Sequence, residues 1–395
     1  MTMRVDYVVV GGGITGVCTA YHLARRGGEV LLIERDQLAP PPPRSSSGEH
    51  AKAFRCAYGR DRRMTRLCLE SLQHWRQLEQ EAGCELLVPS GMVVFGADQP
   101  STLRHWTNPQ AARFATDSRA TLDDEGLPHE LLPKQELVNR YPQIADNDFY
   151  DHAILDRTAG FVHARTAVRE IGRLATSAGA TIWEHTTVAD CVRDGSRVER
   201  LITTRGDVVP AVSVVFAAGH MNGTLAPELR PKTRVTGQQV LYLEPADPAP
   251  FDPSRFPIVV NVNQWRYVFP VHGPGITKVA DDDKFPKEKE IDPRQEGRTG
   301  ADDWFRAEAR DFLRTFVPGL AAAKEVDSIT CRYTNTVNDN YLIYKHANTV
   351  VLSACSGHGF KNAPMTSLMA ASLADGRTES HHLTAGFGYG HAASF

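Results

Sequence analysis

Three glycines and a glutamate near the start of the chain have the types and the spacing that bind a dinucleotide. An apolar stretch at residues 5–10 leads into Gly11, Gly13 and Gly16, and Glu34 follows 18 residues after the last glycine. In this pattern the glycines allow a tight strand-to-helix turn, approach of the backbone to a pyrophosphate, and close packing of the helix on the strand. A carboxylate at this distance can accept hydrogen bonds from ribose hydroxyls. The spacing predicts a dinucleotide site, because an ordinary glycine-rich turn does not account for Glu34.

The elements that must position these residues are a helix and a second strand. A helix is predicted to begin near Ile14, so that its free N–H groups and the positive end of its dipole face the phosphates. The helix ends at Gly27, and an apolar strand follows at 29–33. We assign Ile14, Thr15 and Arg35 to the same cofactor site, because they border the glycine turn and the ribose acid.

The composition is that of a soluble globular protein. Its 395 residues are too many for one compact core, so two domains are expected. A formal net charge of −3 offers no basic excess for nucleic acid or an anionic membrane. The apolar run at 8–10 is too short to span a bilayer, and Asp6 precedes it where a signal peptide has basic residues.

The cysteines favour a reducing compartment. All seven are scattered without CxxC spacing, which indicates neither a zinc or other metal site nor a disulfide framework. We therefore expect a cytoplasmic monomer or small homo-oligomer with no metal, nucleic-acid or membrane partner.

The first half of the chain alternates between helical and strand-like segments. The run PPPPRSSSG predicts a loop over 40–48, just after the ribose acid, and Ser46 in this loop is a candidate cofactor contact. The next predicted elements are an amphipathic helix over 63–82, a short strand over 91–96 and a polar, partly helical segment over 100–148. They are followed by a helix within 160–178, a strand over 181–185 and a hairpin region that begins at Val188, another candidate contact.

The second half returns to the cofactor and then forms a sheet. An apolar strand ends in the small residues Ala217, Ala218 and Gly219, which let the backbone approach a ligand. Strand-like pieces at 238–243, 258–262 and 266–269 indicate an antiparallel sheet that is the floor or roof of a substrate cavity. The remaining predicted elements are a helix over 304–315, a strand, glycine turn and helix start over 349–364, and a mobile tail over 384–395.

Five short motifs give the chain a family resemblance. GGGITG (11–16), FRCAYG (54–59), SGMVVFG (90–96), CRYT (331–334) and SGHGFK (356–361) occur in the order and spacing of the sarcosine oxidase-like amine oxidases. The resemblance covers nearly the whole chain. It implies a flavoprotein of the D-amino-acid-oxidase-like group that oxidises the C–N bond of secondary or tertiary amino acids, with FAD attached to a cysteine.

The resemblance also implies an α/β fold with interleaved domains. A Rossmann-like FAD-binding domain of the glutathione-reductase type is expected over 1–88, 155–220 and 334–380. An α+β substrate domain with a mixed or antiparallel sheet is expected over 89–154 and 221–333, with a flexible tail at 381–395.

Carried over to this sequence, the resemblance makes Cys331 the candidate for a covalent link to the flavin. A thiolate can add to the electron-poor flavin methyl position when basic neighbours lower its pKa. Arg332 is adjacent in the chain, and Lys278 or Lys361 is expected nearby in space. The alternative is a buried, inert thiol.

The resemblance implies roles for further side chains. A buried ammonium at Lys278 would stabilise the negative charge that develops as oxygen is reduced, whereas the alternative is a solvated lysine on a strand. Arg55 and Lys361 match the pair that binds the substrate carboxylate, the guanidinium through two parallel donors. The alternative for Arg55 is a surface ion pair. Tyr267 matches a ring beside the substrate, and its alternative is a core aromatic.

The glycine turn near the end of the chain is expected to contact the flavin ring. Its residues are Gly357, His358, Gly359, Phe360 and Lys361. Backbone N–H groups there would face the pyrimidine oxygen and stabilise negative charge on the reduced flavin. The His358 side chain itself is expected to be structural.

Two departures from the family pattern concern the substrate. The family's histidine four residues beyond the oxygen-activating lysine is replaced by Asp282, and its His-Gly-Asp-x-Arg loop is replaced by residues 48–52. The pocket is therefore not expected to be built for sarcosine. We hypothesise that Asp282, Glu49 or His50 meets an extra polar or cationic group on a larger amino or imino acid.

The prediction is an FAD-dependent amine oxidase that converts an N-methyl or cyclic amino acid to an imine and reduces O2 to hydrogen peroxide. One alternative is a dehydrogenase of similar fold that passes electrons to a quinone or a carrier protein, which Lys278 disfavours. Another is a flavin-binding protein without catalysis, which the joint presence of Arg55, Lys278, Cys331 and Lys361 disfavours. An NAD-dependent dehydrogenase is a weaker alternative, because the second half lacks a recognisable acid/base pattern for a nicotinamide site.

Overall fold

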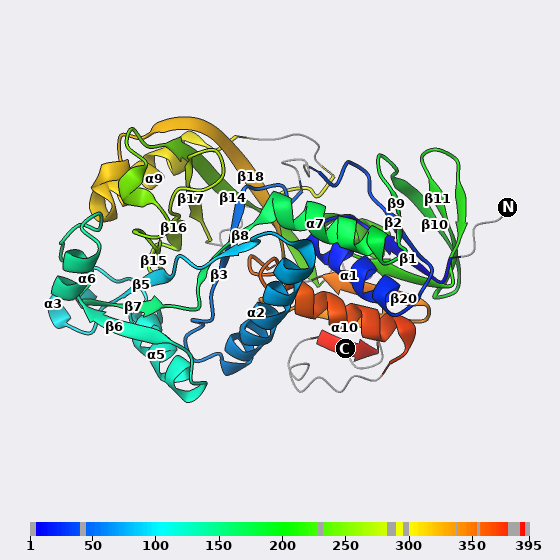
Figure 1. Ribbon diagram of the computed structural model, residues 1–395, viewed down its shortest axis with the longest axis horizontal. Coiled ribbons are helices and arrows are strands. Elements are labelled where there is room, and N and C mark those ends of the chain that lie inside the picture. The colour runs from blue at the N-terminus through cyan, green and yellow to red at the C-terminus, as the bar shows by residue number, and fades with distance from the viewer. Residues whose placement is uncertain are drawn as a thin grey trace.

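The computed structural model of the chain describes residues 5–39, 45–227, 232–282, 290–294, 300–336, 338–353, 356–377 and 388–391. Two large sheets lie in separate halves of an elongated molecule, and the chain passes between them several times (Figure 1). Residues that are distant in the sequence therefore meet where the halves join.

The first large sheet is mostly parallel. Its seven strands have the order β21-β19-β20-β13-β1-β2-β9. They are β1 (Tyr7–Val10), β2 (Val30–Ile33), β9 (Thr181–Trp183), β13 (Ser213–Phe216), β19 (Leu342–His346), β20 (Thr349–Ser353) and β21 (Gly388–His391). Neighbours from β20 to β9 are parallel, and β19 is antiparallel to β20.

Both faces of this sheet are covered, which explains why its strands are apolar throughout. Successive side chains of a strand point to opposite faces. Val9 packs in the core that includes the helices, whereas Val8 and Val10 pack in a second core with Val198 and Leu201 of a small antiparallel sheet. The helices are α1 (Ile14–Arg25), α7 (Ala164–Ser177) and α10 (Ala363–Asp375), and the small sheet contains β10 (Val188–Asp194), β11 (Arg197–Thr203) and β12 (Val208–Pro210).

The second large sheet has eight strands in the order β18-β14-β17-β16-β15-β5-β7-β6. They are β5 (Met92–Gly96), β6 (His129–Pro133), β7 (His152–Asp156), β14 (Thr233–Glu244), β15 (Ile258–Asn261), β16 (Arg266–Val268), β17 (Thr277–Asp281) and β18 (Lys324–Thr336). Strands β15 and β5 pair in parallel, and the other neighbours are antiparallel. The helices of this half are α3 (Pro100–Leu103), α4 (Pro109–Ala112), α5 (Phe114–Asp124), α6 (Lys134–Arg140) and α9 (Asp303–Phe316), with short 3-10 turns at Ala249–Phe251 and Pro318–Leu320.

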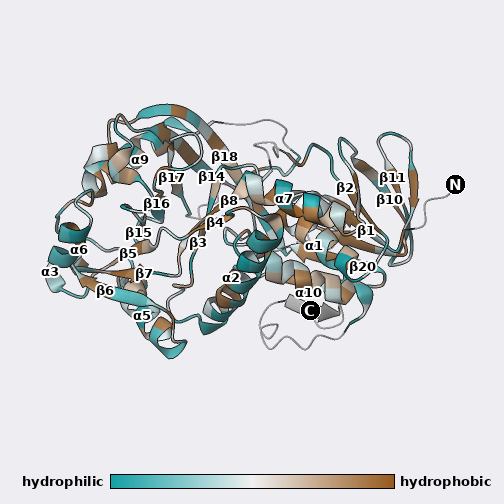
Figure 2. Ribbon diagram, viewed as in Figure 1, coloured by the Kyte–Doolittle hydropathy of each residue, from teal (hydrophilic) through white to brown (hydrophobic). Residues whose placement is uncertain are grey.

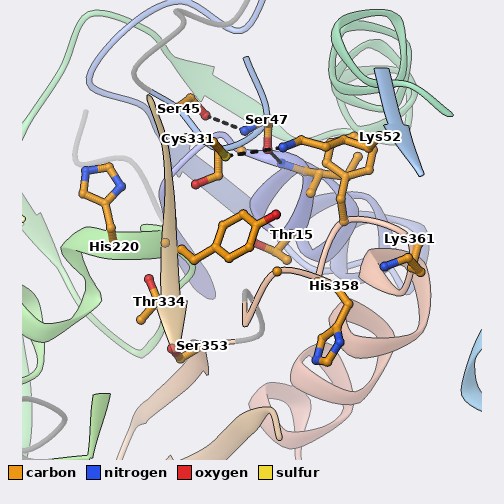
Figure 3. A pocket seen from close by; sticks show the side chains of 18 of the residues that line it. Thr15, Ser45, Ser47, Lys52, His220, Cys331, Thr334, Ser353, His358 and Lys361 are labelled. Atoms are coloured by element: carbon orange, nitrogen blue, oxygen red, sulfur yellow. Dashed lines mark hydrogen bonds between the residues drawn. The ribbon is translucent and has the colours of Figure 1, made fainter. Parts of the chain in front are cut away.

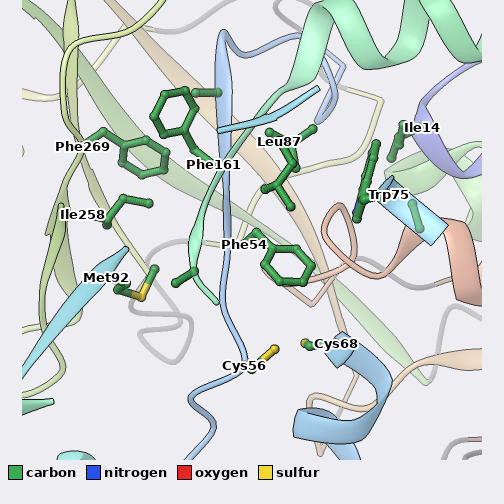
Figure 4. Close-up of a cluster of buried hydrophobic side chains, with 14 of the residues drawn as sticks. Ile14, Phe54, Cys56, Cys68, Trp75, Leu87, Met92, Phe161, Ile258 and Phe269 are labelled. Carbon is green, nitrogen blue, oxygen red and sulfur yellow. The ribbon is translucent and has the colours of Figure 1, made fainter. Parts of the chain in front are cut away.

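A third sheet and helix α2 join the two halves. The sheet has the order β3 (Ala51–Phe54), β8 (Gly160–His163) and β4 (Leu87–Val88). Helix α2 (Arg62–Ala82) begins where the Asp61 side chain accepts a hydrogen bond from Met64 N at 3.1 Å, and it ends at Gly83, whose φ is 72°. Phe54, Trp75 and Phe161 share one buried core with residues of the second sheet (Figure 4). A 3-10 turn (Gly219–Met221) and α8 (Asn222–Leu225) follow β13.

The α/β architecture predicted from the sequence is confirmed, and two details were wrong. The strand predicted over 181–185 ends at Trp183, and His185 has a left-handed backbone with φ of 53° that extended chain does not tolerate. The tail predicted to be mobile contains β21, which pairs in parallel with β19. The remaining residues of 381–395, and 40–44 of the predicted loop, lie outside the described residues.

Hydropathy follows the layers: the strands of both sheets are largely apolar and the outer helix faces are polar (Figure 2). Among the described helices, none combines the length and the apolar character needed to cross a lipid bilayer.

Candidate active site

A cavity lined by residues of both large sheets collects nearly all of the predicted site residues. Those on its wall are Gly11, Gly13, Ile14, Thr15, Glu34, Arg35, Ser46, Arg55, Val188, Ala218, Gly219, Tyr267, Lys278, Asp282, Cys331, Gly357, His358, Gly359, Phe360 and Lys361. Gly16 is not on the wall. The fold thus brings together groups that are more than 300 residues apart in the sequence.

The glycine turn at one end of the cavity has no room for side chains. Gly11 has φ of +106°, and a Cβ there would lie 2.7 Å from the Ala217 carbonyl oxygen. A Cβ on Gly16 would lie 1.7 Å from the Gly11 carbonyl oxygen, so Gly16 serves the contact between helix and strand. This glycine cradle, which has no side chain at Gly11 or Gly13 on the cavity wall, suits close approach of a dinucleotide to the backbone.

Backbone donors and a buried acid surround the same turn. Gly13 precedes helix α1 and gives it no side-chain cap. The Glu34 carboxylate accepts hydrogen bonds from Gly12 N and from Asp36 N, the latter at 2.8 Å, and burial raises its pKa above the ordinary value. Ser47 was not predicted: its Oγ accepts from Ile14 N at 3.1 Å, so this N–H group already has a partner.

Cys331 lies on β18 and points toward a lysine that the sequence did not single out. Its Sγ accepts a hydrogen bond from Lys52 Nζ at 3.5 Å (Figure 3). Lys52 is on β3 and lines the cavity. The prediction named Arg332, Lys278 or Lys361 as the basic neighbour; Lys278 does interact electrostatically with Cys331, and Lys52 is a further cation, hydrogen-bonded to its Sγ.

Lys278, on β17, is buried rather than solvated. Its side chain is 1% exposed, and Nζ donates to Glu49 Oε2 at 2.6 Å and to Ala51 O at 3.0 Å. Nζ also lies 4.6 Å from the centroid of the Phe269 ring and 5.6 Å from that of Tyr267. Burial lowers the pKa of Lys278 below its ordinary value, and Glu49 opposes this shift. The alternative of a solvated strand lysine is wrong.

Arg55 and Lys361 approach the same aromatic ring. The Arg55 guanidinium carbon lies 4.0 Å from the centroid of Tyr58, and Lys361 Nζ lies 5.9 Å from it. The same guanidinium carbon lies 5.6 Å from the centroid of the Phe114 ring. Arg55 forms no ion pair with any carboxylate among the described residues, so the surface ion pair considered above is wrong. Two cations on the wall of one cavity can bind a carboxylate.

A buried carboxylate holds the loop after Arg55. Asp156, at the end of β7, accepts hydrogen bonds from Cys56 N at 2.8 Å and Ala57 N at 2.9 Å. It also accepts from Thr158 N and Thr158 Oγ1. An Asp followed two residues later by Thr is a common turn signal, but its contact with a loop 100 residues away is not visible in the sequence.

Of the three residues expected to meet an extra group on the substrate, Asp282 alone lines the cavity. Its backbone N–H donates to Trp265 O at 2.7 Å, and its Oδ1 is buried without a hydrogen-bond partner among the described residues. The expectation for Glu49 and His50 is wrong. The Glu49 carboxylate pairs with Lys278 and Lys52, and the His50 ring packs edge-on against Tyr242.

Aromatic contacts and hydrogen bonds hold the turn after β20 in place. The His358 ring lies edge-on to Tyr58 and Tyr341, and its Nε2 lies 3.0 Å from Asp339 O. The indole N–H of Trp75 donates to Lys361 O at 2.8 Å. These contacts agree with a structural role for the His358 side chain.

The comparisons with known proteins cover most of the chain. A model of the family described as DAO, FAD dependent oxidoreductase, matches residues 6–373. Peroxisomal sarcosine oxidase of Mus musculus is 29% identical over 372 residues, which cover 91% of this chain and 89% of the relative. N-methyl-L-tryptophan oxidase of Salmonella dublin is 28% identical over 389 residues, with coverage of 97% and 98%.

A solved structure supports the fold. L-proline dehydrogenase from P. horikoshii matches with a TM-score of 0.81 at 20% identity, covering 96% of each chain. The relatives confirm the resemblance to sarcosine oxidase-like enzymes stated above. Since the family model spans most of the sequence and the glycine cradle fits the cofactor, the chain belongs to the DAO family of FAD-dependent oxidoreductases.

Proposed function

We propose that the protein is an amine oxidase that oxidises the C–N bond of a secondary or cyclic amino acid. The substrate loses two electrons and two protons to become an imine. O2 takes up the two electrons and two protons to become hydrogen peroxide. The observation that carries the proposal is the approach of Arg55 and Lys361 to one ring, in a cavity that also contains Lys278 and Cys331. An oxygen-uptake screen over N-methyl and cyclic amino acids tests it.

The residues that would hold FAD lie along the cavity. The glycine turn, Glu34 and Arg35 would bind the adenosine and pyrophosphate part, and the turn at 357–361 would bind the flavin part. When bound, FAD would supply an acceptor for the two electrons of the amine and a source of those electrons for oxygen. We keep the predicted domain division, with 1–88, 155–220 and 334–380 for the cofactor and 89–154 and 221–333 for the substrate. The membership of most strands in one or the other large sheet supports it.

Six cavity residues have a defined task in this proposal. Arg55 and Lys361 bind the substrate carboxylate and so orient the carbon that is oxidised. Tyr267 and the apolar residues Met92 and Val260 exclude water from that carbon. The Lys278 ammonium stabilises the negative charge that develops on oxygen.

A second candidate is a dehydrogenase that passes electrons to a quinone or a carrier protein. The pairing of Lys278 with a buried carboxylate favours it, because the carboxylate offsets part of the positive charge that oxygen reduction would use. Turnover with oxygen, compared with turnover with an artificial dye, separates the two candidates.

The flavin is expected to be covalently bound through Cys331. The contact with Lys52 supports this, because a neighbouring ammonium favours the thiolate form. After acid precipitation of the purified protein, yellow colour should remain in the pellet, and the Cys331→Ser variant should release it to the supernatant. Cys56→Ser, at another buried cysteine, is the matched control. Colour in the wild-type supernatant would rule out the link while leaving FAD binding intact.

We further propose that the substrate carries a cationic or other hydrogen-bond-donating group, and that Asp282 binds it. Leaving a carboxylate oxygen buried and unpartnered is unfavourable, and a donor on the substrate would remove that cost. The cavity wall includes Trp265, whose carbonyl oxygen accepts from Asp282 N, and the apolar residues Val262 and Ile258, which would contact an apolar stem. Sarcosine has neither a stem nor a second donor.

Asp282→Asn is expected to abolish a preference for charged side chains. Nα-methyl-lysine and Nα-methyl-norleucine have similar size and differ in the terminal ammonium. The wild type should favour the first by about 10- to 100-fold in kcat/KM, as one hydrogen bond to a charged group predicts. The variant should treat both substrates alike. An unchanged ratio would remove Asp282 from the account of specificity, and Asp252→Asn on the surface serves as control.

A further inference from the structure

Glu49 is a buried carboxylate behind the wall of the cavity. It is 2% exposed and does not line the cavity. Its Oε2 accepts a hydrogen bond from Lys278 Nζ at 2.6 Å, and its Oε1 accepts one from Lys52 Nζ. Lys278 is on β17 and Lys52 is on β3, so one carboxylate joins strands of two different sheets.

The two lysines keep this buried carboxylate ionised, and the carboxylate in turn affects the pKa of Lys278. Burial alone would raise the pKa of Glu49, but Lys278 and Lys52 hold it at about 2, so the group is ionised at neutral pH. Burial lowers the pKa of Lys278, Lys52 lowers it further, and Glu49 raises it. Two positive charges and one negative charge therefore share a site from which water is largely excluded.

The other titratable groups that face Lys278 do not replace Glu49. They are Tyr267 from β16, Cys331 from β18, His50 from the loop before β3, and His272 from the loop between β16 and β17. Burial lowers the pKa of both histidines, that of His272 to about 3, so they add no positive charge at neutral pH. Among the described residues, Glu49 is the carboxylate in hydrogen-bond contact with the Lys278 ammonium.

We propose that Glu49 is a positioning residue for Lys278, keeping its ammonium charged and directing it toward the cavity. Glu49 and the Ala51 carbonyl accept two of the three N–H donors of the ammonium, and the third has no partner among the described residues. Since Nζ belongs to a side chain on the cavity wall, this third donor is available there. The inference rests on the proposed role of Lys278 in the reaction with oxygen.

The test is the pH dependence with which the reduced holoenzyme reacts with oxygen. Rapid mixing would be followed from about pH 6 to about pH 10, a range that approaches the ordinary pKa of lysine. In Glu49→Gln the Lys278 pKa is expected to fall, so that the ammonium loses its proton at a lower pH. The drop of the rate constant with rising pH should therefore occur at least about one pH unit lower than in the wild type. Glu49→Asp keeps the charge and should retain the wild-type profile. Glu244→Gln, in a surface pair with Lys324, is the matched control.

Thermal unfolding gives a readout that needs no activity. Glu49→Gln is expected to lower the unfolding midpoint by several degrees, and adding Lys278→Met to it should restore part of the loss, because the unpaired buried ammonium is then gone. If Glu49→Gln does not fold, the double variant should still do so.

Three outcomes decide the matter. A Glu49→Gln profile that superimposes on the wild type, while Lys278→Met is slow, would overturn this inference alone. Additive losses of stability, or a double variant that does not fold, would also overturn it. A Lys278→Met variant that reacts with oxygen at the wild-type rate would instead overturn the proposed role of Lys278.

Discussion

Replacing Lys278 by methionine is expected to slow the reaction of the reduced enzyme with oxygen by roughly 100- to 1,000-fold, the usual effect of removing one electrostatic stabiliser of a reacting oxygen. The ammonium is buried beside the cavity, so its field is little screened by water. Methionine keeps the length and apolar character of the side chain. Stopped-flow reoxidation measures the effect.

The same variant should leave reduction by the amine nearly unchanged. This split is the signature of a group that acts on oxygen rather than on the substrate. Lys324→Met, at a lysine with a side chain 76% exposed on β18, is the control for the loss of one lysine. Equal slowing of both half-reactions would show that Lys278 supports the site in general and has no specific task with oxygen.

Replacing Arg55 by glutamine is expected to lower kcat/KM for an amino acid substrate by roughly 100- to 1,000-fold, as the loss of one member of a buried charge pair predicts. The guanidinium lies against Tyr58 and forms no ion pair with a described residue, so its charge is available to a ligand. Lys361 remains and retains part of the attraction. Steady-state kinetics with the best N-methyl or cyclic substrate measures the loss.

A substrate without a carboxylate separates binding from folding effects. The corresponding secondary amine should be a poor substrate of the wild type and should lose little further activity in Arg55→Gln. Arg60→Gln is the matched control. Arg60 is an exposed arginine in the loop that follows Arg55, and it pairs with Asp117 on α5. A similar loss with both substrates would mean that Arg55 acts through the structure of the loop.

The sequence allowed prediction of those site residues whose signal is local. The turn around Gly11 and the strand ending at Ala217 are each recognisable from a few neighbouring residues, and the structure shows why: a side chain at Gly11 would collide with the Ala217 backbone. The cavity wall at Arg55, Lys278 and Cys331 followed from motifs matched to a family rather than from any local rule.

The remaining features depend on contacts between distant strands. Glu49 and Lys52 are three residues apart and of opposite charge, which usually indicates a surface pair. Their burial follows from the position of β3 beside β17 and β18, which no local pattern encodes. The contact of Asp156 with the loop after Arg55 spans 100 residues, for the same reason.

Anaerobic titration of the purified flavoprotein with N-methyl and cyclic amino acids tests the central claim most directly. The account predicts that at least one of them bleaches the yellow flavin absorbance, and that admitting air restores it with one hydrogen peroxide per flavin. Failure of every secondary amino acid to bleach the flavin would contradict the claim that this is an amine-oxidising enzyme. Bleaching that air does not reverse but an artificial dye does would contradict its assignment as an oxidase.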